Sequence, residues 1–293
     1  IRRQRQMCIR DRHFTYSIIT NIDQDHIDYH ESLKNYIDSK LKILNQSRTS
    51  ILNFDSKNLK KIDHRKYKCK DILYISQNKI KEKKIINIPS REKLSPLKNL
   101  NSYSLLMIFA VMRLEKFKIP MIFKSIINLN SIKGRRQIFS TSKRGDFIID
   151  YAHTVQAYMN IYKDFNINRN ICTLFGCGGD RDKSKRKKTA KIVDQFSSKI
   201  IITEDNSRTE KFETILHDIM KGIKNLDKVK IIKSRKKAIK YMLQTSSSDQ
   251  LNFILGKGNE DYILENNKKI KHNDVIYLKK IISSYEYKTI KDC

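Results

Sequence analysis

Short runs of β-branched and aromatic residues alternate with helical patterns through the second half of this chain, and this alternation most constrains the fold. Three such runs cover residues 147–149, 170–175 and 199–203, and each leads directly into a cluster of polar residues. Runs of this kind, separated by helical segments, indicate βαβ units and a parallel sheet. The sequence therefore predicts an α/β fold with polar turns at the carboxyl ends of its strands.

The polar clusters occupy residues 150–154, 176–183 and 204–208, and a fourth cluster at 256–261 follows a strand pattern at 251–255. In an open parallel sheet, ligands bind in the crevice outside the carboxyl ends of the strands. We therefore expect the four clusters to meet on one edge of the sheet.

The charges in these clusters are mixed. Arg181 and Arg208 offer planar guanidinium groups suited to carboxylates, whereas Asp205 and Glu260 offer acceptors suited to an ammonium group. Together they would form a receptor for a zwitterion such as an amino acid. The alternative is a set of ordinary surface ion pairs, each contributing about 0–1 kcal/mol. Spacing alone leaves both interpretations open.

The glycine-rich turn at 176–179 suggests a phosphate cradle, because backbone N–H groups at the start of a helix bind anions. It matches neither GxGxxG nor the Walker pattern, since Asp182 stands where the latter requires glycine before Lys183 and Ser184. No nucleotide-binding P-loop is predicted here. A tight turn without a ligand is the simpler interpretation.

The first half of the chain has its own polar cluster. Two acids and two histidines lie within residues 25–30, after a strand pattern at 14–20. Mg²⁺ favours oxygen ligands with an occasional imidazole, so this cluster is a candidate cation site. A polar loop with incidental histidines is the alternative. Further patterns predict strands at 50–54 and 72–76 and helices at 32–44, 103–117 and 120–129.

A length of 293 residues allows two domains, and Gly134 marks the expected boundary. Residues 1–12 lack an initiator Met, and their composition differs from that of the Lys-, Ile- and Asn-rich remainder, so we expect them to be a non-native leader. The domains would then cover 13–133 and 134–293.

The net charge of +30 has two interpretations. It could mark a nucleic-acid or anionic-surface binder, or it could be compositional drift, because the excess is spread along the chain. The five cysteines form no CxxC pair, which disfavours a zinc site or disulfide framework and favours a reducing cytoplasm. No apolar run approaches the roughly 20 residues needed to span a bilayer.

Several motifs together resemble the Mur ligases, most closely their diaminopimelate-adding members. Thr20-Asn21, the 25–30 cluster, Lys40, Asn101 and Gly134-Arg135 look like the central domain of that family. Four motifs resemble its carboxyl-terminal domain in order and spacing: Asp150-Tyr151-Ala152-His153-Thr154, Gly176-Cys177-Gly178-Gly179-Asp180-Arg181-Asp182-Lys183, Asp205-Asn206-Ser207-Arg208 and Gly256-Lys257-Gly258-Asn259-Glu260. The resemblance covers about residues 13–280.

The resemblance implies a partial central, ATP-binding domain followed by a Rossmann-like carboxyl-terminal domain with a mostly parallel sheet. It implies a cytoplasmic enzyme of peptidoglycan synthesis with no membrane or nucleic-acid partner. Such ligases use ATP and Mg²⁺ to activate UDP-N-acetylmuramoyl-L-alanyl-D-glutamate as an acyl phosphate, which the amine of meso-2,6-diaminopimelate attacks. The family's Gly-Lys-Thr loop and UDP-sugar domain are missing, so we expect this chain alone to be inactive. The alternatives are a lysine-adding or other Mur-type ligase, a basic nucleic-acid binder, and a decaying inactive copy.

The resemblance also implies individual roles. His26 and Lys40 would hold Mg²⁺, with Lys40 carbamylated and therefore catalytic; His153 would also be catalytic. Arg208 would pair with the distal carboxylate that lysine lacks. The family usually has Pro where this chain has Val155 and Ser207, and His at Asn259, so we expect looser turns but the same substrate. Arg135, Asp150 and His153 would contact the nucleotide, and the diaminopimelate site would comprise Arg181, Asp205, Asn206, Ser207, Arg208, Gly256 and Glu260.

Overall fold

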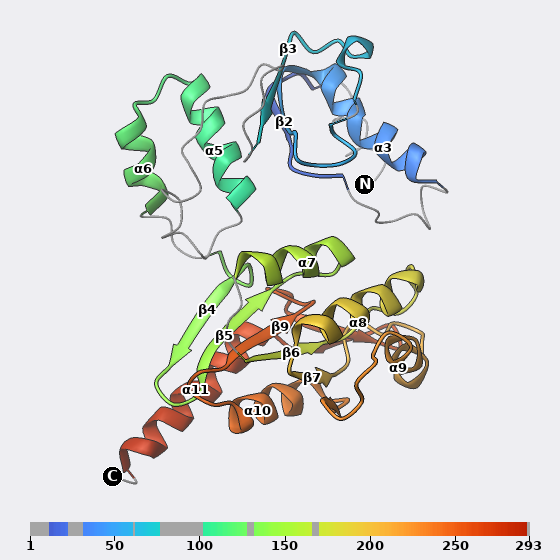
Figure 1. Cartoon of the computed structure of the whole chain (residues 1–293), viewed down its shortest axis with the longest axis vertical. Helices are drawn as coiled ribbons and strands as arrows, with labels where there is room; N and C mark the ends of the chain where they lie inside the picture. Colours follow the sequence, from blue (N-terminus) through green and yellow to red (C-terminus); the bar gives the residue numbers. More distant parts are fainter. Residues whose placement is uncertain are drawn as a thin grey trace. The chain divides into compact units, whose positions relative to one another are not determined.

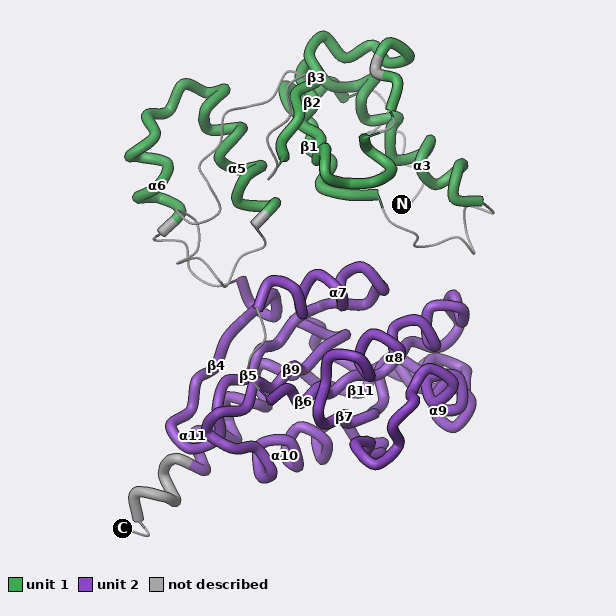
Figure 2. Tube along the Cα trace, viewed as in Figure 1, with its two compact units in different colours: residues 1–130 green, residues 131–293 purple. Residues whose placement is uncertain are grey.

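The computed structural model divides into two compact units, Ile1–Asn130 and Ser131–Cys293 (Figure 2). The residues that it describes are 12–22, 32–60, 62–76, 102–127, 132–165 and 170–291.

Unit 1 contains a three-stranded parallel sheet in the order β1-β2-β3. Its strands are β1 (Phe14–Ile19), β2 (Ser47–Asn53) and β3 (Asp71–Ile75). Helix α3 (Leu33–Leu41) begins after Ser32, whose Oγ accepts a hydrogen bond from the backbone N–H of Asn35 at 3.1 Å, as an N-cap residue does. Short 3₁₀ segments follow at Lys42–Gln46 and His64–Lys66.

Two helices complete the described part of unit 1: α5 (Ser102–Leu114) and α6 (Ile119–Ile127). Pro120 lies in the first turn of α6, where its missing N–H removes no helical hydrogen bond. Helix α5 packs on the sheet through a core of Ile51, Ile75, Leu106, Met107 and Ala110. Its neighbouring face meets α6 through Leu105, Phe109, Ile122 and Ile126.

Unit 2 is built on a six-stranded sheet in the order β4-β5-β9-β6-β7-β8 (Figure 1). All neighbouring strands are parallel except the edge pair β4–β5, which is antiparallel. The strands are β4 (Gln137–Thr141), β5 (Gly145–Asp150), β6 (Ile171–Phe175), β7 (Lys199–Ile202), β8 (Val229–Ile231) and β9 (Leu251–Leu255). The predicted mostly parallel α/β sheet is confirmed.

Helices cover both faces of this sheet, so unit 2 has two hydrophobic cores. On one face lie α7 (Val155–Asp164), α8 (Ser184–Phe196) and α9 (Phe212–Met220), with a core that includes Tyr158, Val193 and Ile219. On the other lie α10 (Arg235–Thr245) and α11 (Asp274–Lys291), with a core that includes Ile239, Met242 and Leu278.

Strand β9 lies between β5 and β6, although it comes last of the six in the chain. Asn252 is the register partner of both Phe147 in β5 and Cys172 in β6. The carboxyl ends of β5, β9, β6 and β7 therefore lie side by side. Past this edge, the chain forms an antiparallel hairpin of β10 (Tyr262–Glu265) and β11 (Lys268–Lys271).

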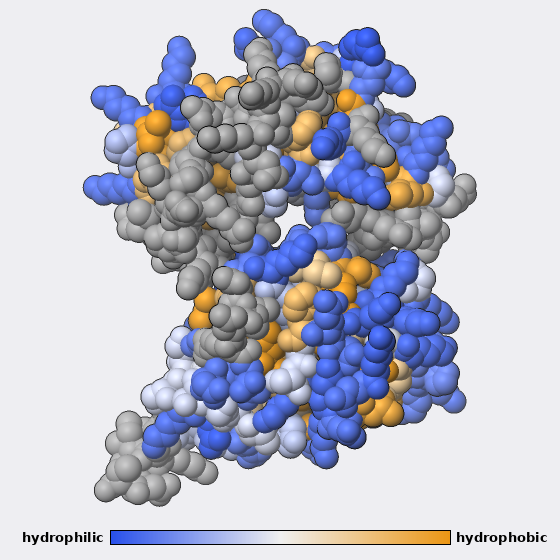
Figure 3. Space-filling view, viewed as in Figure 1, coloured by the Kyte–Doolittle hydropathy of each residue, from blue (hydrophilic) through white to orange (hydrophobic). Residues whose placement is uncertain are grey.

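On the face that Figure 3 shows, the surface of unit 2 is mostly hydrophilic, with smaller apolar patches between the hydrophilic residues. Lys187, Lys188 and Lys191 of α8 are exposed. Among the residues that the structure describes, no helix is both long and apolar enough to cross a membrane.

Candidate functional site

The turn after β7 carries three polar residues, Asp205, Asn206 and Ser207, that are buried although they lie outside any strand. The Asn206 side chain accounts for much of this: its Nδ2 donates to Glu260 Oε2 at 2.9 Å, and its Oδ1 accepts from the backbone N–H of Leu264 at 2.8 Å. Both partners come from the segment after β9. Asn206 therefore joins two turns that are more than 50 residues apart in sequence.

The turn after β9 approaches its neighbours so closely that glycine is required. Gly256 has φ +110°, and a Cβ there would lie 2.7 Å from Asp205 Oδ2. At Gly134, with φ +66°, a Cβ would lie 2.2 Å from the backbone N of Asn259. Only glycine adopts such φ values without strain and also leaves room for the facing atoms. These close approaches attach the β9 turn to the β7 turn and to the segment before β4.

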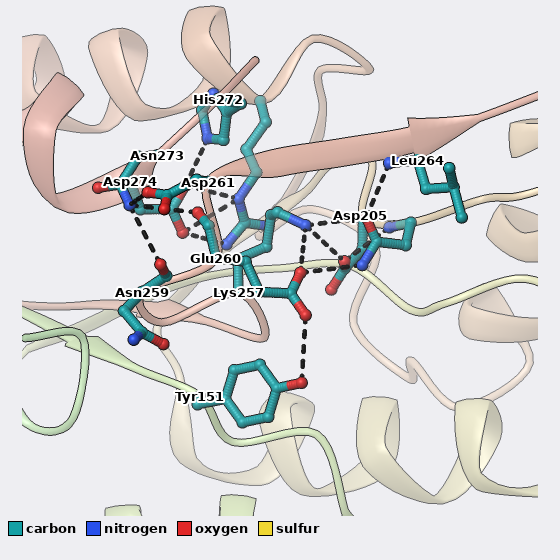
Figure 4. Close-up of polar contacts among 12 residues, drawn as sticks. Tyr151, Asp205, Lys257, Asn259, Glu260, Asp261, Leu264, His272, Asn273 and Asp274 are labelled. Carbon is teal, nitrogen blue, oxygen red and sulfur yellow. Dashed lines mark hydrogen bonds and ion pairs between the residues drawn. The ribbon is translucent and has the colours of Figure 1, made fainter. Parts of the chain in front are cut away.

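Lys257 lies between these turns with no exposed side-chain surface. Its Nζ donates to Glu260 Oε2 at 2.7 Å, to Asn206 Oδ1 at 3.0 Å and to Asp205 Oδ1 at 3.4 Å (Figure 4). One buried ammonium therefore binds three acceptors, two of which are carboxylates.

Tyr151, in the turn after β5, contacts Glu260 in the turn after β9 as well as Arg135 and His153. Its hydroxyl donates to Glu260 Oε1 at 3.1 Å (Figure 4). The guanidinium carbon of Arg135 lies 4.5 Å from its ring centroid, and the ring of His153 lies 4.8 Å away, edge to face. Burial and the adjacent Glu260 raise the pKa of Tyr151, so its hydroxyl stays protonated and can donate.

Asp150, the last residue of β5, is half-buried. Burial raises the pKa of its carboxyl group, although the backbone N–H of Arg136, which donates to Oδ2 at 2.9 Å, opposes this. The Arg136 side chain is paired with Asp164 of α7. Asp150 thus ties the end of β5 to the segment that carries Arg135.

Arg208 has φ +54° and is half-buried. Its Nη1 donates to the carbonyl oxygen of Gly179 at 2.7 Å and to that of Asn206 at 3.2 Å. The backbone N–H of Gly179 in turn donates to the Asn206 carbonyl at 2.9 Å. The turns after β6 and β7 are therefore joined through both backbone and side-chain bonds.

Arg186, a fully buried arginine of α8, bonds to the turns after β6 and β7 from the helix side. It donates to both carboxylate oxygens of Glu210, at 2.8 and 3.0 Å, and to the carbonyl oxygen of Gly178 at 3.1 Å. The bonds from Arg186 lower the pKa of Glu210 to about 2. Glu210 also accepts from the backbone N–H of Asp180.

A second buried arginine, Arg235 of α10, supports the turn after β9. It forms an ion pair with Asp274 at 2.8 Å and donates to the carbonyl oxygen of Leu255, the last residue of β9, at 2.9 Å. His272 Nε2 lies 2.6 Å from Asp274 Oδ1. Burial alone would raise the pKa of Asp274, but the charge of Arg235 and these hydrogen bonds hold it well below its ordinary value.

The contacts confirm that the four polar turns meet on one edge of the sheet. The bonds above link the turns of Asp150, Gly179, Asn206 and Glu260 directly or through one residue. Arg181 lies in the same β6 turn with an exposed side chain. The roles that the resemblance implies for the individual residues stay predictions.

The cation-site residues of the first half are placed only in part. His26 and Asn101 lie outside the described residues. Lys40 lies in the last turn of α3, exposed, with its Nζ 5.4 Å from the ring centroid of Tyr36. No group of three or more His, Cys, Asp or Glu side chains in the described part of the chain could hold a metal ion.

Sequence reasoning did not assign a role to Lys257, Tyr151 or Arg186. The first two lie within quoted motifs, but a lysine in a polar turn is usually exposed, and nothing in the pattern showed that this one is enclosed. Arg186 stands in the basic run 183–188, and its side chain is nevertheless fully buried.

Two family models match the chain: the Mur ligase middle domain over residues 4–119, and the Mur ligase glutamate ligase domain over 134–258. Curated relatives include UDP-N-acetylmuramoyl-L-alanyl-D-glutamate–2,6-diaminopimelate ligases. The one from Wigglesworthia glossinidia brevipalpis is 34% identical over 96% of this chain, and the one from Helicobacter pylori strain J99 is 32% identical over 89%.

Solved structures show the same fold. A structure of the same type of ligase has a TM-score of 0.55 at 24% identity and covers 93% of this chain and 61% of its own. A pseudomurein peptide ligase type C from Methanothermus fervidus has a TM-score of 0.62 at 16% identity and covers 92% and 63%. The chain spans 61% and 62% of the two curated relatives. Two matched domains in succession and relatives along nearly all of its length show that the chain belongs to the Mur ligase family.

Proposed function

We propose that this chain is the middle and carboxyl-terminal part of a ligase that joins meso-2,6-diaminopimelate to UDP-N-acetylmuramoyl-L-alanyl-D-glutamate. The observation that carries this proposal is the joining of the turns after β6, β7 and β9, which brings the β7 turn, with Arg208 and the buried Asp205, against the half-buried Glu260. The two relatives described above carry the name of that activity.

The residues of unit 2 would hold the amino acid by its distal end. Arg208 would bind the distal carboxylate, and Glu260 and Asp205 would accept from the distal ammonium, with Asn206 holding Glu260 in place. Fixing that end leaves the other amine free to attack the activated D-glutamyl carboxylate. Orientation of this kind lowers the reaction barrier, because the reactants lose translational and rotational entropy on binding and not in the chemical step. Arg181, Ser207 and Gly256 complete the proposed diaminopimelate site.

The remaining assignments concern the activating half-reaction. ATP, when bound, supplies the phosphoryl group that activates the D-glutamyl carboxylate. Arg135, Asp150 and His153 would face the nucleotide, and the stacking of Arg135 and His153 on Tyr151 supports a shared role. Lys40 is exposed, so its amine is accessible to CO₂, and as a carbamate it would help His26 to hold Mg²⁺. The nucleotide substrates place the proposed reaction in the cytoplasm.

A lysine-adding ligase is the second candidate within the family. Lysine has no distal carboxylate, so a half-buried Arg208 would lose its ligand partner while remaining partly desolvated. A site built to bond a group rejects the analogue that lacks it. The position of Arg208 beside the turn after β6 therefore favours diaminopimelate.

Calorimetric titration of the 293-residue chain with meso-2,6-diaminopimelate and with L-lysine tests the proposal. We expect binding of diaminopimelate with at least about a tenfold preference over lysine, the scale of one charged hydrogen bond. Equal affinity for both, or binding of neither, would overturn the proposal. A preference for lysine would favour the second candidate.

A further inference from the structure

The enclosure of Lys257 is unusual for its residue type. Lysine is rarely fully buried unless it is paired, because removing an ammonium group from water is very unfavourable. Here the Nζ binds three oxygens, and every one belongs to a residue of the proposed amino-acid site. The chain thus places a cation inside a receptor that is meant to receive a cation.

The bonds around Glu260 show what this buried ammonium does. Oε1 accepts from the Tyr151 hydroxyl, and Oε2 accepts from both Asn206 and Lys257 (Figure 4). Donors from three directions leave this carboxylate little freedom to rotate. The carboxylates of Asp205 and Glu260 both lie within 3.4 Å of the Lys257 Nζ. Without this cation between them, the two negative charges would repel each other.

We propose that Lys257 is the positioning residue of the amino-acid site. It does not touch the amino acid; its ammonium holds the Asp205 and Glu260 carboxylates at the spacing that receives the distal ammonium. Two carboxylates and one lysine leave a charge of −1, which matches a single ammonium group. This inference rests on the proposed function, since it names how that site is held in shape.

Three possible roles for Lys257 predict different changes in ligand affinity when its charge is removed. If it only repelled the incoming ammonium, its removal would strengthen binding of that group. If it only stabilised the fold, its removal would weaken all ligands equally. As a positioning residue, its removal weakens the ammonium contact selectively, because preorganised acceptors bind better than mobile ones.

The experiment compares two ligands by calorimetry on the 293-residue chain. They are meso-2,6-diaminopimelate and 2-aminopimelate, which keeps the distal carboxylate but lacks the distal ammonium. Their affinity ratio reports the ammonium contact alone. The variants are Lys257→Met, which keeps the length without the charge, and Lys257→Arg, which keeps the charge. Lys268→Met is the matched control, because it removes the same charge from an exposed position of β11.

We expect Lys257→Met to lower the ratio by about tenfold, the scale of one charged hydrogen bond. Lys257→Arg should recover at least part of the ratio, and Lys268→Met should leave it unchanged. An increased or unchanged ratio in folded Lys257→Met would overturn the inference. If Lys257→Met does not fold, Lys257→Gln, which keeps a donor without the charge, is judged by the same criterion.

The failure of this inference and that of the proposed function are distinguishable. If the wild-type chain binds neither ligand, the proposed function fails and the role of Lys257 fails with it. If the wild-type chain prefers diaminopimelate and Lys257→Met keeps that preference, only the positioning role is wrong.

Discussion

The Nη1 atom of Arg208 lies 2.7 Å from the carbonyl oxygen of Gly179, so one arm of its guanidinium group belongs to the turn after β6. The same atom also donates to Asn206. No described residue accepts from Nε or Nη2 of Arg208. One arm therefore fixes the plane of the group, and a planar fork that is already oriented loses less entropy when its other nitrogens bind a carboxylate.

Replacement of Arg208 tests this arrangement. We expect Arg208→Lys to weaken diaminopimelate binding by about tenfold, because lysine keeps the charge but not the fork. Lysine binding should change little. Arg144→Ala is the control: its Nη1 also donates to two backbone carbonyls, at the opposite edge of the sheet. An equal loss for both ligands in Arg208→Lys would contradict a role in carboxylate recognition.

The hydroxyl of Tyr151 can be removed without its ring. Tyr151→Phe keeps the stack with Arg135 but deletes the bond to Glu260, so we expect a loss of amino-acid affinity of about fivefold, equivalent to about 1 kcal/mol. Calorimetric titration with meso-2,6-diaminopimelate measures it. Tyr277→Phe, on α11, should leave the affinity at the wild-type value; an unchanged affinity in Tyr151→Phe would show that Glu260 needs no support from this side.

Gly134 faces the backbone of Gly258 and Asn259, which cannot move away without the rest of the turn after β9. An alanine Cβ would lie 2.2 Å from the N atom of Asn259, at φ +66°. We expect Gly134→Ala to destabilise unit 2 by about 3 kcal/mol. Gly178→Ala is the comparison, because its φ is not in the left-handed region and its Cβ would lie 3.1 Å from Arg208 Nη1 and 3.6 Å from the Asn206 carbonyl oxygen, with no atom as close as at Gly134. Urea unfolding curves measure both, and similar losses would contradict the close approach at Gly134.

Glu210 should make the stability of unit 2 sensitive to acid. Its pKa falls from an ordinary 4.5 to about 2 in the folded protein. The folded state therefore favours the ionised form, and this stabilisation is complete above pH 4.5 and lost as the pH falls toward 2. In melting curves recorded from pH 6 to pH 2.5, the melting temperature of Glu210→Gln should fall less with decreasing pH than that of the wild type.

The exposed Glu213 provides the matched control for that series. Glu213→Gln should follow the wild-type dependence, since no buried arginine in the described part of the chain pairs with it. If Glu210→Gln also followed the wild-type curve, the bond from Arg186 would contribute nothing to acid sensitivity.

The sequence predicted β5, β6, β7 and β9 of unit 2 because each is a short apolar run that ends at a polar turn. The pattern at 251–255 coincides with β9. The position of β9 between β5 and β6 was not predicted, because strand order depends on long-range packing that local periodicity does not record. The antiparallel edge strand β4 was missed for a related reason: its partly exposed residues form no clear apolar run.

For the site, the sequence identified residues whose chemistry is visible in their type. Asp205 and Glu260 are acceptors wherever they lie, and Arg208 is a planar donor. The enclosure of Lys257 could not be inferred, because it depends on φ +110° at Gly256 and on Asn206 reaching across to the next turn. Burial of a polar side chain follows from such contacts and not from composition.

The central position of β9 has a consequence for synthesis. The chain reaches residue 255 only after β5, β6, β7 and β8 have been made, so the sheet stays without the strand between β5 and β6 until residues 251–255 emerge from the ribosome. A product released before that point would lack the strand that joins β5 to β6 and would leave Asn206 without Glu260. Synthesis of β9 and of the turn that follows it therefore decides whether the receptor exists.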